Sequence, residues 1–244
     1  MPRRLGFLDG LRAFFGGIGF VLFRPKMWGW AAIPIFVATL LFGATGALAI
    51  WGGASLADQV LSGATSGWAA AGLWGLRVLF WIVGLLLAFL LALTLAQPLS
   101  GFALDAIARR QELALGGRTW PDQPLFPSLF RSLRVTLFAL AVSLPLLLLL
   151  SVVTLLFPPA SVVTVPLKLA VAGFAISYDF LDYPLGLRGE EVGARAAFLR
   201  RHAAAVLGFG LAASVVLLVP GLGLLLLPFG VAGATRLVVL ADRP

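Results

Sequence analysis

Uncharged apolar runs constrain this chain more than any other feature of its sequence. The longest runs without a charged side chain are Trp28–Trp51, Val135–Leu167 and Ala203–Thr235. About 20 apolar residues in a helix span the hydrocarbon core of a bilayer. The whole chain is 61% hydrophobic and 11% charged, whereas a soluble domain carries about 25% charged residues. We therefore expect an all-α integral membrane protein in which residues 1–244 form a single membrane domain.

Two apolar runs have the form of long transmembrane helices. The Trp28–Trp51 run carries tryptophan at both ends, where indole rings prefer the membrane interface. The second run covers Val78–Ala96, and Arg77 near its start can extend its long side chain toward the interface. Residues 52–72 between the two runs are rich in glycine, serine and alanine and are expected to form a loop.

The runs Val135–Leu167 and Ala203–Thr235 are predicted to be helical hairpins. A straight helix of that length measures about 50 Å, against a hydrocarbon core of about 30 Å, and two complete spans need more residues than one run offers. We expect the first run to fold at its prolines into two arms that cross the membrane wholly or in part. A full double span remains open there, because the helix can continue past Lys168 to Ile176. The second run should fold in the same way. The interrupting residues are Pro145 and Pro158-Pro159 in the first run, and Pro220-Gly221 and Pro228 in the second. Backbone that turns inside a membrane must be covered by protein or line a water-filled cavity, which favours a homo-oligomer.

The N-terminal segment, residues 1–26, predicts an amphipathic helix on the membrane surface. Apolar residues recur at spacings of three and four from Leu5 to Val21, among arginines that would face lipid phosphates.

Basic residues set the expected orientation. Residues 1–26 hold five Lys and Arg side chains, residues 97–134 hold five more, and residues 52–72 hold none. Residues 97–134, in which Gly116-Gly117 and the stretch Pro121–Pro127 should break any helix, and residues 177–202 are both expected to be basic loops. The positive-inside rule then places both termini and all basic loops in the cytoplasm.

Composition argues against several classes of function. The net charge of +8 comes from short loops between apolar runs, as positive-inside topology predicts, so nucleic acid is not an expected partner. The chain has no cysteine, and its one histidine, His202, cannot form a metal cluster and is expected to be a solvated helix-end residue. The sequence contains no Gly-rich phosphate loop with a lysine, no HExxH and no serine with a histidine partner. We expect no enzyme activity, no cofactor and no metal.

Two motifs are candidate anion sites. Arg24 and Lys26 precede the first span, where two cations near a helix N-terminus can attract an oxyanion; the alternative is membrane anchoring by these side chains. Ser100 and Gly101 follow Pro98, which suits a new helix start whose exposed N–H groups can hold an anion. The alternative there is a plain interfacial turn.

A third motif is acidic. Asp179 and Asp182 are three residues apart, so they would share a helix face, and Tyr183 follows them. Acidic groups beside a membrane cavity can bind cations or relay protons. In the alternative interpretation, Asp182 sits at a helix boundary before Pro184 and pairs with Arg188.

The order and spacing of these motifs resemble the CysZ-type sulfate permease family, also called the etoposide-induced-protein-like membrane family, over nearly the whole chain. The matching residues are Gly19, Pro25, Pro34, Pro98-Leu99-Ser100-Gly101, Asp105, Asp182-Tyr183-Pro184, Phe198, Arg201, Val219-Pro220, Pro228 and Gly233-Ala234-Thr235. The resemblance implies an oligomeric inner-membrane protein with two long transmembrane helices and two helical hairpins. It also implies sulfate uptake that feeds cysteine synthesis.

The chain departs from the family pattern at places that matter for sulfate. Members of the family resemble one another in an arginine pair shortly after the proline that matches Pro25, whereas this chain has Trp28 and Gly29 there. Arg24 and Lys26 are the remaining cations nearby. A second acidic residue, three positions after Asp105 in the family, is Ala108 here.

Two functional hypotheses follow. The first is a passive or gradient-driven bacterial inner-membrane permease for sulfate or a related small oxyanion. No ATP-binding motif is present, so any energy must come from gradients or a partner. The alternative is a non-transporting membrane scaffold or lipid-interacting protein that shares the fold. The expected partners are membrane lipids, a small inorganic anion and further copies of the chain. The residues expected to contact the anion are Arg24, Lys26, Ser100, Gly101, Asp182, Tyr183 and Arg188.

Overall fold

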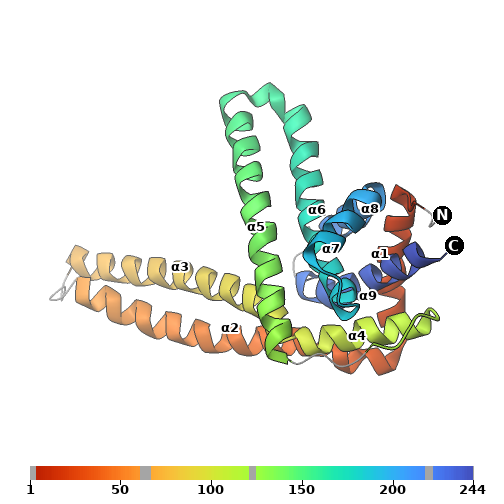
Figure 1. Ribbon diagram of the computed structural model, residues 1–244. Coiled ribbons are helices and arrows are strands. Elements are labelled where there is room, and N and C mark those ends of the chain that lie inside the picture. The colour runs from red at the N-terminus through yellow and green to blue at the C-terminus, as the bar shows by residue number, and fades with distance from the viewer. Residues whose placement is uncertain (1–3, 61–66, 121–124, 218–221, 244) are drawn as a thin grey trace. The chain divides into compact units, whose positions relative to one another are not determined.

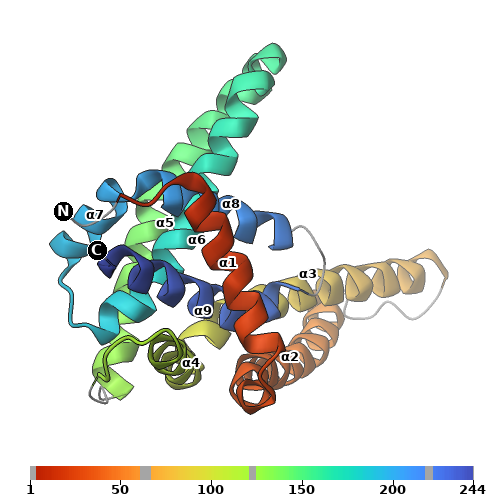
Figure 2. The same ribbon diagram turned by 90° about the vertical axis from the view of Figure 1, so that its right-hand side faces the viewer.

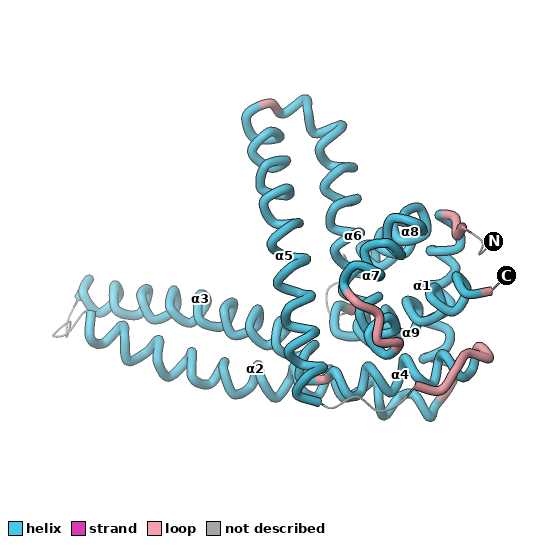
Figure 3. Tube along the Cα trace, in the orientation of Figure 1, coloured by secondary structure: helices cyan, strands magenta, loops and turns pink. Residues whose placement is uncertain are grey.

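The computed structural model describes residues 4–60, 67–120, 125–217 and 222–243, and every regular element in these ranges is helical (Figure 1; Figure 3). Four helices are long and apolar enough to cross a membrane, and a bent helix pair can make a fifth span. The prediction of an all-α membrane protein is therefore confirmed. The helices are α1 (Phe7–Leu22), α2 (Pro25–Val60), α3 (Gly67–Leu99), α4 (Gly101–Ala114), α5 (Leu125–Leu156), α6 (Ser161–Leu187), α7 (Val192–Arg201), α8 (Ala203–Leu217) and α9 (Gly223–Asp242), with a 3₁₀ turn, η1, at Pro158–Ala160.

The chain divides into two compact units. The smaller unit is Pro34–Leu99, and the larger unit combines Met1–Ile33 with Ser100–Pro244. The single membrane domain that we expect from the sequence stays a prediction.

The smaller unit is a hairpin of α2 and α3. The indole N–H of Trp81 donates to the Ile50 carbonyl at 2.9 Å, and the Arg77 guanidinium pairs with Asp58 at 2.5 Å. Both predicted spans lie inside these helices, but the loop expected at 52–72 is largely helical, and residues 61–66 lie outside the described residues. The small residues there fit a helix: Gly53 lets α2 pack against Trp81 of α3, and Ser55 donates its hydroxyl to the Trp51 carbonyl one turn earlier.

The larger unit is built around α1, α6, α8 and α9. Its core centres on Phe209, whose ring meets those of Phe14 and Phe180 edge-on at centroid distances of 5.4 and 6.3 Å. The predicted N-terminal amphipathic helix is confirmed as α1, and its inner face packs on α8 and α9 (Figure 2). Its place on the membrane surface stays a prediction.

Each proline-rich run forms a pair of helices that contact each other. In the first run, α5 and α6 lie side by side and turn at Pro158-Pro159 (Figure 1), whereas Pro145 lies inside α5. The second hairpin pairs α8 with α9, and Pro228 lies inside α9. Its predicted turn at Pro220-Gly221 lies outside the described residues. At 15 residues, α8 is about 22 Å long and reaches only part of the way across a hydrocarbon core.

Two segments expected to be polar loops contain helices. Residues 97–134 hold α4, which buries Leu104, Ile107 and Ala108 on one face, and the helix break expected at Gly116-Gly117 follows its end. Residues 177–202 hold the end of α6 and all of α7. Sequence periodicity missed α4 because charged side chains on its exposed face obscured a short apolar stripe.

Candidate anion-binding site

A pocket of about 870 Å³ lies where α1, α2 and α4 of the larger unit meet. We call it the basic pocket. It contains the cations Arg24, Lys26 and Arg110, and no carboxylate is among the residues that line it. The remaining lining residues are Phe20, Phe23, Pro25, Met27, Leu113 and Ala114.

The sharp junction between α1 and α2 positions Arg24 and Lys26. The Phe23 N–H donates to the Gly19 carbonyl at 3.0 Å and closes α1, and the Met27 N–H donates to the Arg24 carbonyl at 2.8 Å. Pro25 occupies the first position of α2, where its missing N–H costs no helical hydrogen bond. The Arg24 guanidinium carbon lies 4.5 Å from the centre of the Phe20 ring. A cation–π contact of this kind holds the guanidinium while its edge keeps N–H donors for another partner.

Arg110 comes from a distant segment and was not predicted. It lies on the exposed face of α4, with its guanidinium carbon 4.6 Å from the centre of the Trp30 ring. The signal that could have found it is the buried stripe of Leu104, Ile107 and Gln111, because that stripe turns Arg110 outward. Trp28, at one of the family's arginine positions, instead donates its indole N–H to the Leu22 carbonyl at 3.1 Å.

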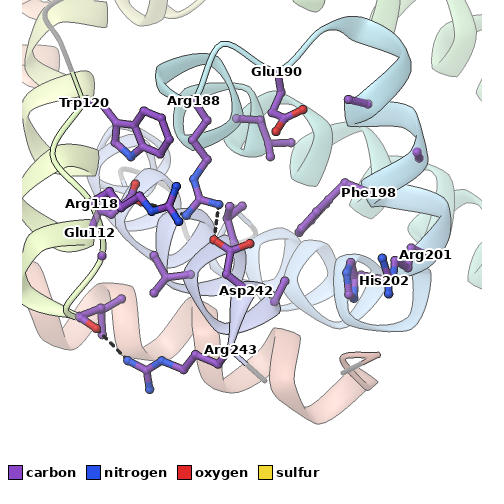
Figure 4. A pocket seen from close by; sticks show the side chains of 18 of the residues that line it. Glu112, Arg118, Trp120, Arg188, Glu190, Phe198, Arg201, His202, Asp242 and Arg243 are labelled. Atoms are coloured by element: carbon purple, nitrogen blue, oxygen red, sulfur yellow. Dashed lines mark hydrogen bonds and ion pairs between the residues drawn. The ribbon is translucent and has the colours of Figure 1, made fainter. Parts of the chain in front are cut away.

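A second pocket, also of about 870 Å³, contains charges of both signs, and we call it the mixed pocket (Figure 4). Arg188 follows the end of α6 and donates to Glu112 of α4 at 2.9 Å and to Asp242 of α9 at 2.5 Å. Trp120 lies beside the Arg188 guanidinium, and Arg201 lies on the other side of the pocket. Two carboxylates thus neutralise the central cation.

Asp182 and Tyr183 lie inside α6 and line neither pocket. Asp182 pairs with Arg195 of α7, and both side chains are buried. The alternative interpretation, in which Asp182 sits at a helix boundary before Pro184 and pairs with Arg188, is therefore wrong, because α6 continues through Pro184 to Leu187 and Arg188 turns toward α4 and α9.

Ser100 and Gly101 mark a helix start, as predicted. α4 begins at Gly101, and the carbonyl of Ser100 accepts the N–H groups of Ala103 and Leu104 at 2.9 and 3.1 Å. Neither residue lines the two pockets. Of the seven predicted site residues, the structure brings Arg24 and Lys26 together in one pocket and places Arg188 in another.

His202 is not the solvated residue that we expected. Only 3% of it is exposed, and its Nδ1 accepts the backbone N–H of Leu5 at 3.3 Å. Burial lowers the pKa of the imidazole below its ordinary value of about 6.5, and the positive charges of Arg201 and Arg4 lower it further.

Comparison with known proteins adds one finding. A family model described as sulfate transporter CysZ/Etoposide-induced protein 2.4 matches residues 13–228, which is most of the chain. No curated protein matches the sequence.

Proposed function

The chain belongs to the sulfate transporter CysZ/Etoposide-induced protein 2.4 family, and we propose that it is a bacterial inner-membrane permease for sulfate or a related small oxyanion. The anion would enter sulfur assimilation after uptake. In this proposal the protein acts as a homo-oligomer in contact with membrane lipids, with both termini in the cytoplasm. It carries out no chemical step on the solute.

The observation that supports this function best is the uncompensated charge of the basic pocket. Arg24, Lys26 and Arg110 meet there without a lining carboxylate. Guanidinium and ammonium groups form strong, short hydrogen bonds to oxyanions, and the partial positive charge at the start of α2 adds to the attraction. The mixed pocket is the weaker candidate, because Glu112 and Asp242 already occupy the terminal nitrogens of Arg188.

The three cations come from two chain segments, which supports a role in recognising the solute. Anchoring to lipid phosphate would need only the two cations beside the first span. Arg110 approaches the same pocket from α4, and a tetrahedral oxyanion offers oxygens in several directions. Recognition by three cations therefore compensates for the arginine pair that Trp28 and Gly29 replace.

The test is sulfate binding and uptake by the purified protein. A charge-assisted hydrogen bond contributes about 1.5–3 kcal/mol, so the double variant Arg24→Ala/Lys26→Ala should bind sulfate at least about tenfold more weakly in calorimetry. Arg110→Ala should weaken binding by about the same factor. Uptake of labelled sulfate into liposomes that contain these variants should fall in parallel.

Arg12→Ala is the matched control, since Arg12 is an exposed cation on α1 and does not line the basic pocket. It should bind and transport sulfate like the unmodified protein. Equal binding by the double variant would move the site elsewhere. If the unmodified protein binds no oxyanion, the non-transporting scaffold becomes the better account.

A further inference from the structure

Lys168 is an isolated charge in an apolar hairpin. It is the one charged residue between Val135 and Tyr178, and it lies on α6, in a segment long and apolar enough to cross a membrane. The exposed side chains around it are apolar; they are Val162, Val163, Val165, Leu167 and Leu169. Ionisable residues in such places are costly, and they commonly mark the path of an ion or solute.

The Lys168 side chain points across the hairpin. Its ammonium donates to the hydroxyl of Thr154 on α5 at 3.0 Å, and the hydroxyls of Thr154 and Thr164 lie 2.6 Å apart. Thr164 is buried, and Lys168 is half-buried. Two threonine hydroxyls therefore hold the lysine in the groove between α5 and α6.

The backbone of Lys168 lies well below the turn of the hairpin, and its ammonium points back toward the turn. Lys168 follows Pro158 by almost three helical turns, which corresponds to about 15 Å of helix below the turn. That distance is about half of a hydrocarbon core of about 30 Å. Thr154 precedes Pro158 by four residues, which corresponds to about 6 Å of helix, so the contact with Thr154 directs the ammonium from the depth of the Lys168 backbone back toward the turn.

The positive charge has no counter-ion within the described structure. No carboxylate there pairs with Lys168, and the nearest acidic residue along α6 is Asp179, about 16 Å further along the helix axis. An ammonium has three N–H donors, and one of them serves Thr154. The other two N–H donors remain available, so a ligand for this site must carry hydrogen-bond acceptors and a negative charge.

We propose that Lys168, with Thr154 and Thr164, forms a second contact for a small inorganic oxyanion inside the membrane. The anion is the one that the basic pocket binds, so this inference rests on the proposed function and extends it along the route of the solute. The ammonium supplies the charge and its remaining N–H donors, which replace part of the hydration shell. The Thr154 hydroxyl donates to the Leu150 carbonyl and accepts from Lys168 and Thr164, so the two threonines hold the ammonium in place. One ammonium without an arginine binds weakly, which suits a site that the anion must leave again.

The two lysines of this chain allow one experiment to report on both sites. Lys26 lies in the basic pocket and Lys168 in the hairpin, and the sequence has no other lysine. Reductive methylation of the detergent-solubilised protein, followed by mass spectrometry of each lysine, measures access to both amines. Sodium sulfate should slow methylation of both lysines at least threefold relative to sodium gluconate of equal ionic strength.

The outcomes separate the two proposals. Protection of Lys26 alone overturns the hairpin site and leaves the proposed function standing. Protection of Lys168 alone supports the hairpin site and overturns the basic pocket. Protection of neither lysine overturns both. Protection of Lys168 by phosphatidylglycerol and not by sulfate assigns the lysine to a lipid phosphate and overturns the inference.

Variants give a second readout in liposomes. Lys168→Met keeps most of the length of the side chain without its charge and should reduce sulfate flux at least tenfold, while sulfate affinity at the basic pocket stays within twofold. Lys168→Arg should restore most of the flux. Thr154→Val should reduce flux severalfold, whereas the control Thr94→Val, which removes a hydroxyl bonded to its own helix, should not. Normal flux in Lys168→Met would overturn the inference.

Discussion

His202 links the N-terminal segment to the break between α7 and α8. Its Nδ1 can accept the Leu5 N–H only while that nitrogen carries no proton. The axes of α7 and α8, which flank it, differ in direction by 88°. The imidazole therefore lies where α7, α8 and the N-terminal segment meet. A protonated imidazole would lose the Leu5 hydrogen bond and face Arg201 and Arg4 with a like charge.

We predict that the protein loses stability as the pH falls below about 6.5. The pKa of His202 is lowered in the folded state, so the unfolded chain binds the extra proton first. The stabilisation is complete above the unfolded value of about 6.5 and is lost as the pH falls from there toward the folded pKa. Thermal unfolding in detergent at pH 7 and pH 5 should show a midpoint several degrees lower at pH 5.

His202→Asn tests this assignment. An asparagine carbonyl can accept the Leu5 N–H and does not titrate, so the variant should lose most of the difference between pH 7 and pH 5. The chain has no other histidine, and exposed carboxylates titrate mainly below pH 5. An unchanged pH dependence in the variant would assign the effect to another group.

For single residues, the sequence indicates which side chains are charged but not which of them form ion pairs or share a pocket. Asp182 and Arg188 are close in sequence, yet α6 directs Asp182 to Arg195 and leaves Arg188 to Glu112 and Asp242. Arg24 and Lys26 could be predicted because one junction holds both. Arg110 could not, because its place depends on how α4 packs against elements distant in sequence.

Glycine sets how closely the helices of the larger unit approach. A Cβ added to Gly17 of α1 would lie 2.2 Å from the backbone nitrogen of Gly233 on α9. A Cβ added to Gly210 of α8 would lie 1.9 Å from the carbonyl oxygen of Gly173 on α6. Small residues that let backbones approach are the usual interface of membrane helices, because packing drives their association within lipid.

Gly17→Ala and Gly19→Ala form a matched pair for this packing. In an open helix site, alanine in place of glycine stabilises by about 0.5–1 kcal/mol. Gly19 has only the flexible Phe23 ring nearby, at 3.8 Å, so Gly19→Ala should unfold at the same temperature as the unmodified protein or a higher one. Gly17→Ala should lower the unfolding midpoint by several degrees, since the backbone of α9 must move away. Equal midpoints for the two variants would show that α1 and α9 pack more loosely than the structure indicates.

The helices could be predicted from sequence better than their ends. Lengths of apolar runs locate α2, α3 and both hairpins. Treating every proline as a helix break predicts wrong helix ends, because Pro145, Pro184 and Pro228 all lie within helices. Neighbouring helices and local adjustment satisfy the freed carbonyl groups in membrane proteins. The pair Pro158-Pro159 does turn the chain, because two consecutive prolines remove adjacent donors.

At the scale of the whole molecule, exposed apolar side chains and loop charges together define the relation to the membrane. Leu48 and Trp51 of α2 are 65% and 72% exposed, and Leu155 and Val162 of the α5–α6 hairpin are 80% and 79% exposed. Such surfaces are stable in lipid or against another copy of the chain. They indicate that the chain lies in a membrane, whereas the distribution of Lys and Arg predicts which way it faces.

We predict that residues 61–66 face the periplasm and that the segment after α4 faces the cytoplasm. Residues 1–26 and residues 97–134 hold five Lys and Arg side chains each, whereas residues 52–72 hold none, and basic loops remain in the cytoplasm. Arg77, the one cation on α3, pairs with Asp58 on α2, so it does not oppose this orientation. The chain has no cysteine, which allows single cysteines at Ser62 and at the exposed Thr119. A membrane-impermeant maleimide should label the Ser62→Cys variant in intact cells and the Thr119→Cys variant only after permeabilisation. Labelling of both variants in intact cells would place both segments on the same side of the membrane. The helices α2 and α3 would then not cross the membrane in opposite directions.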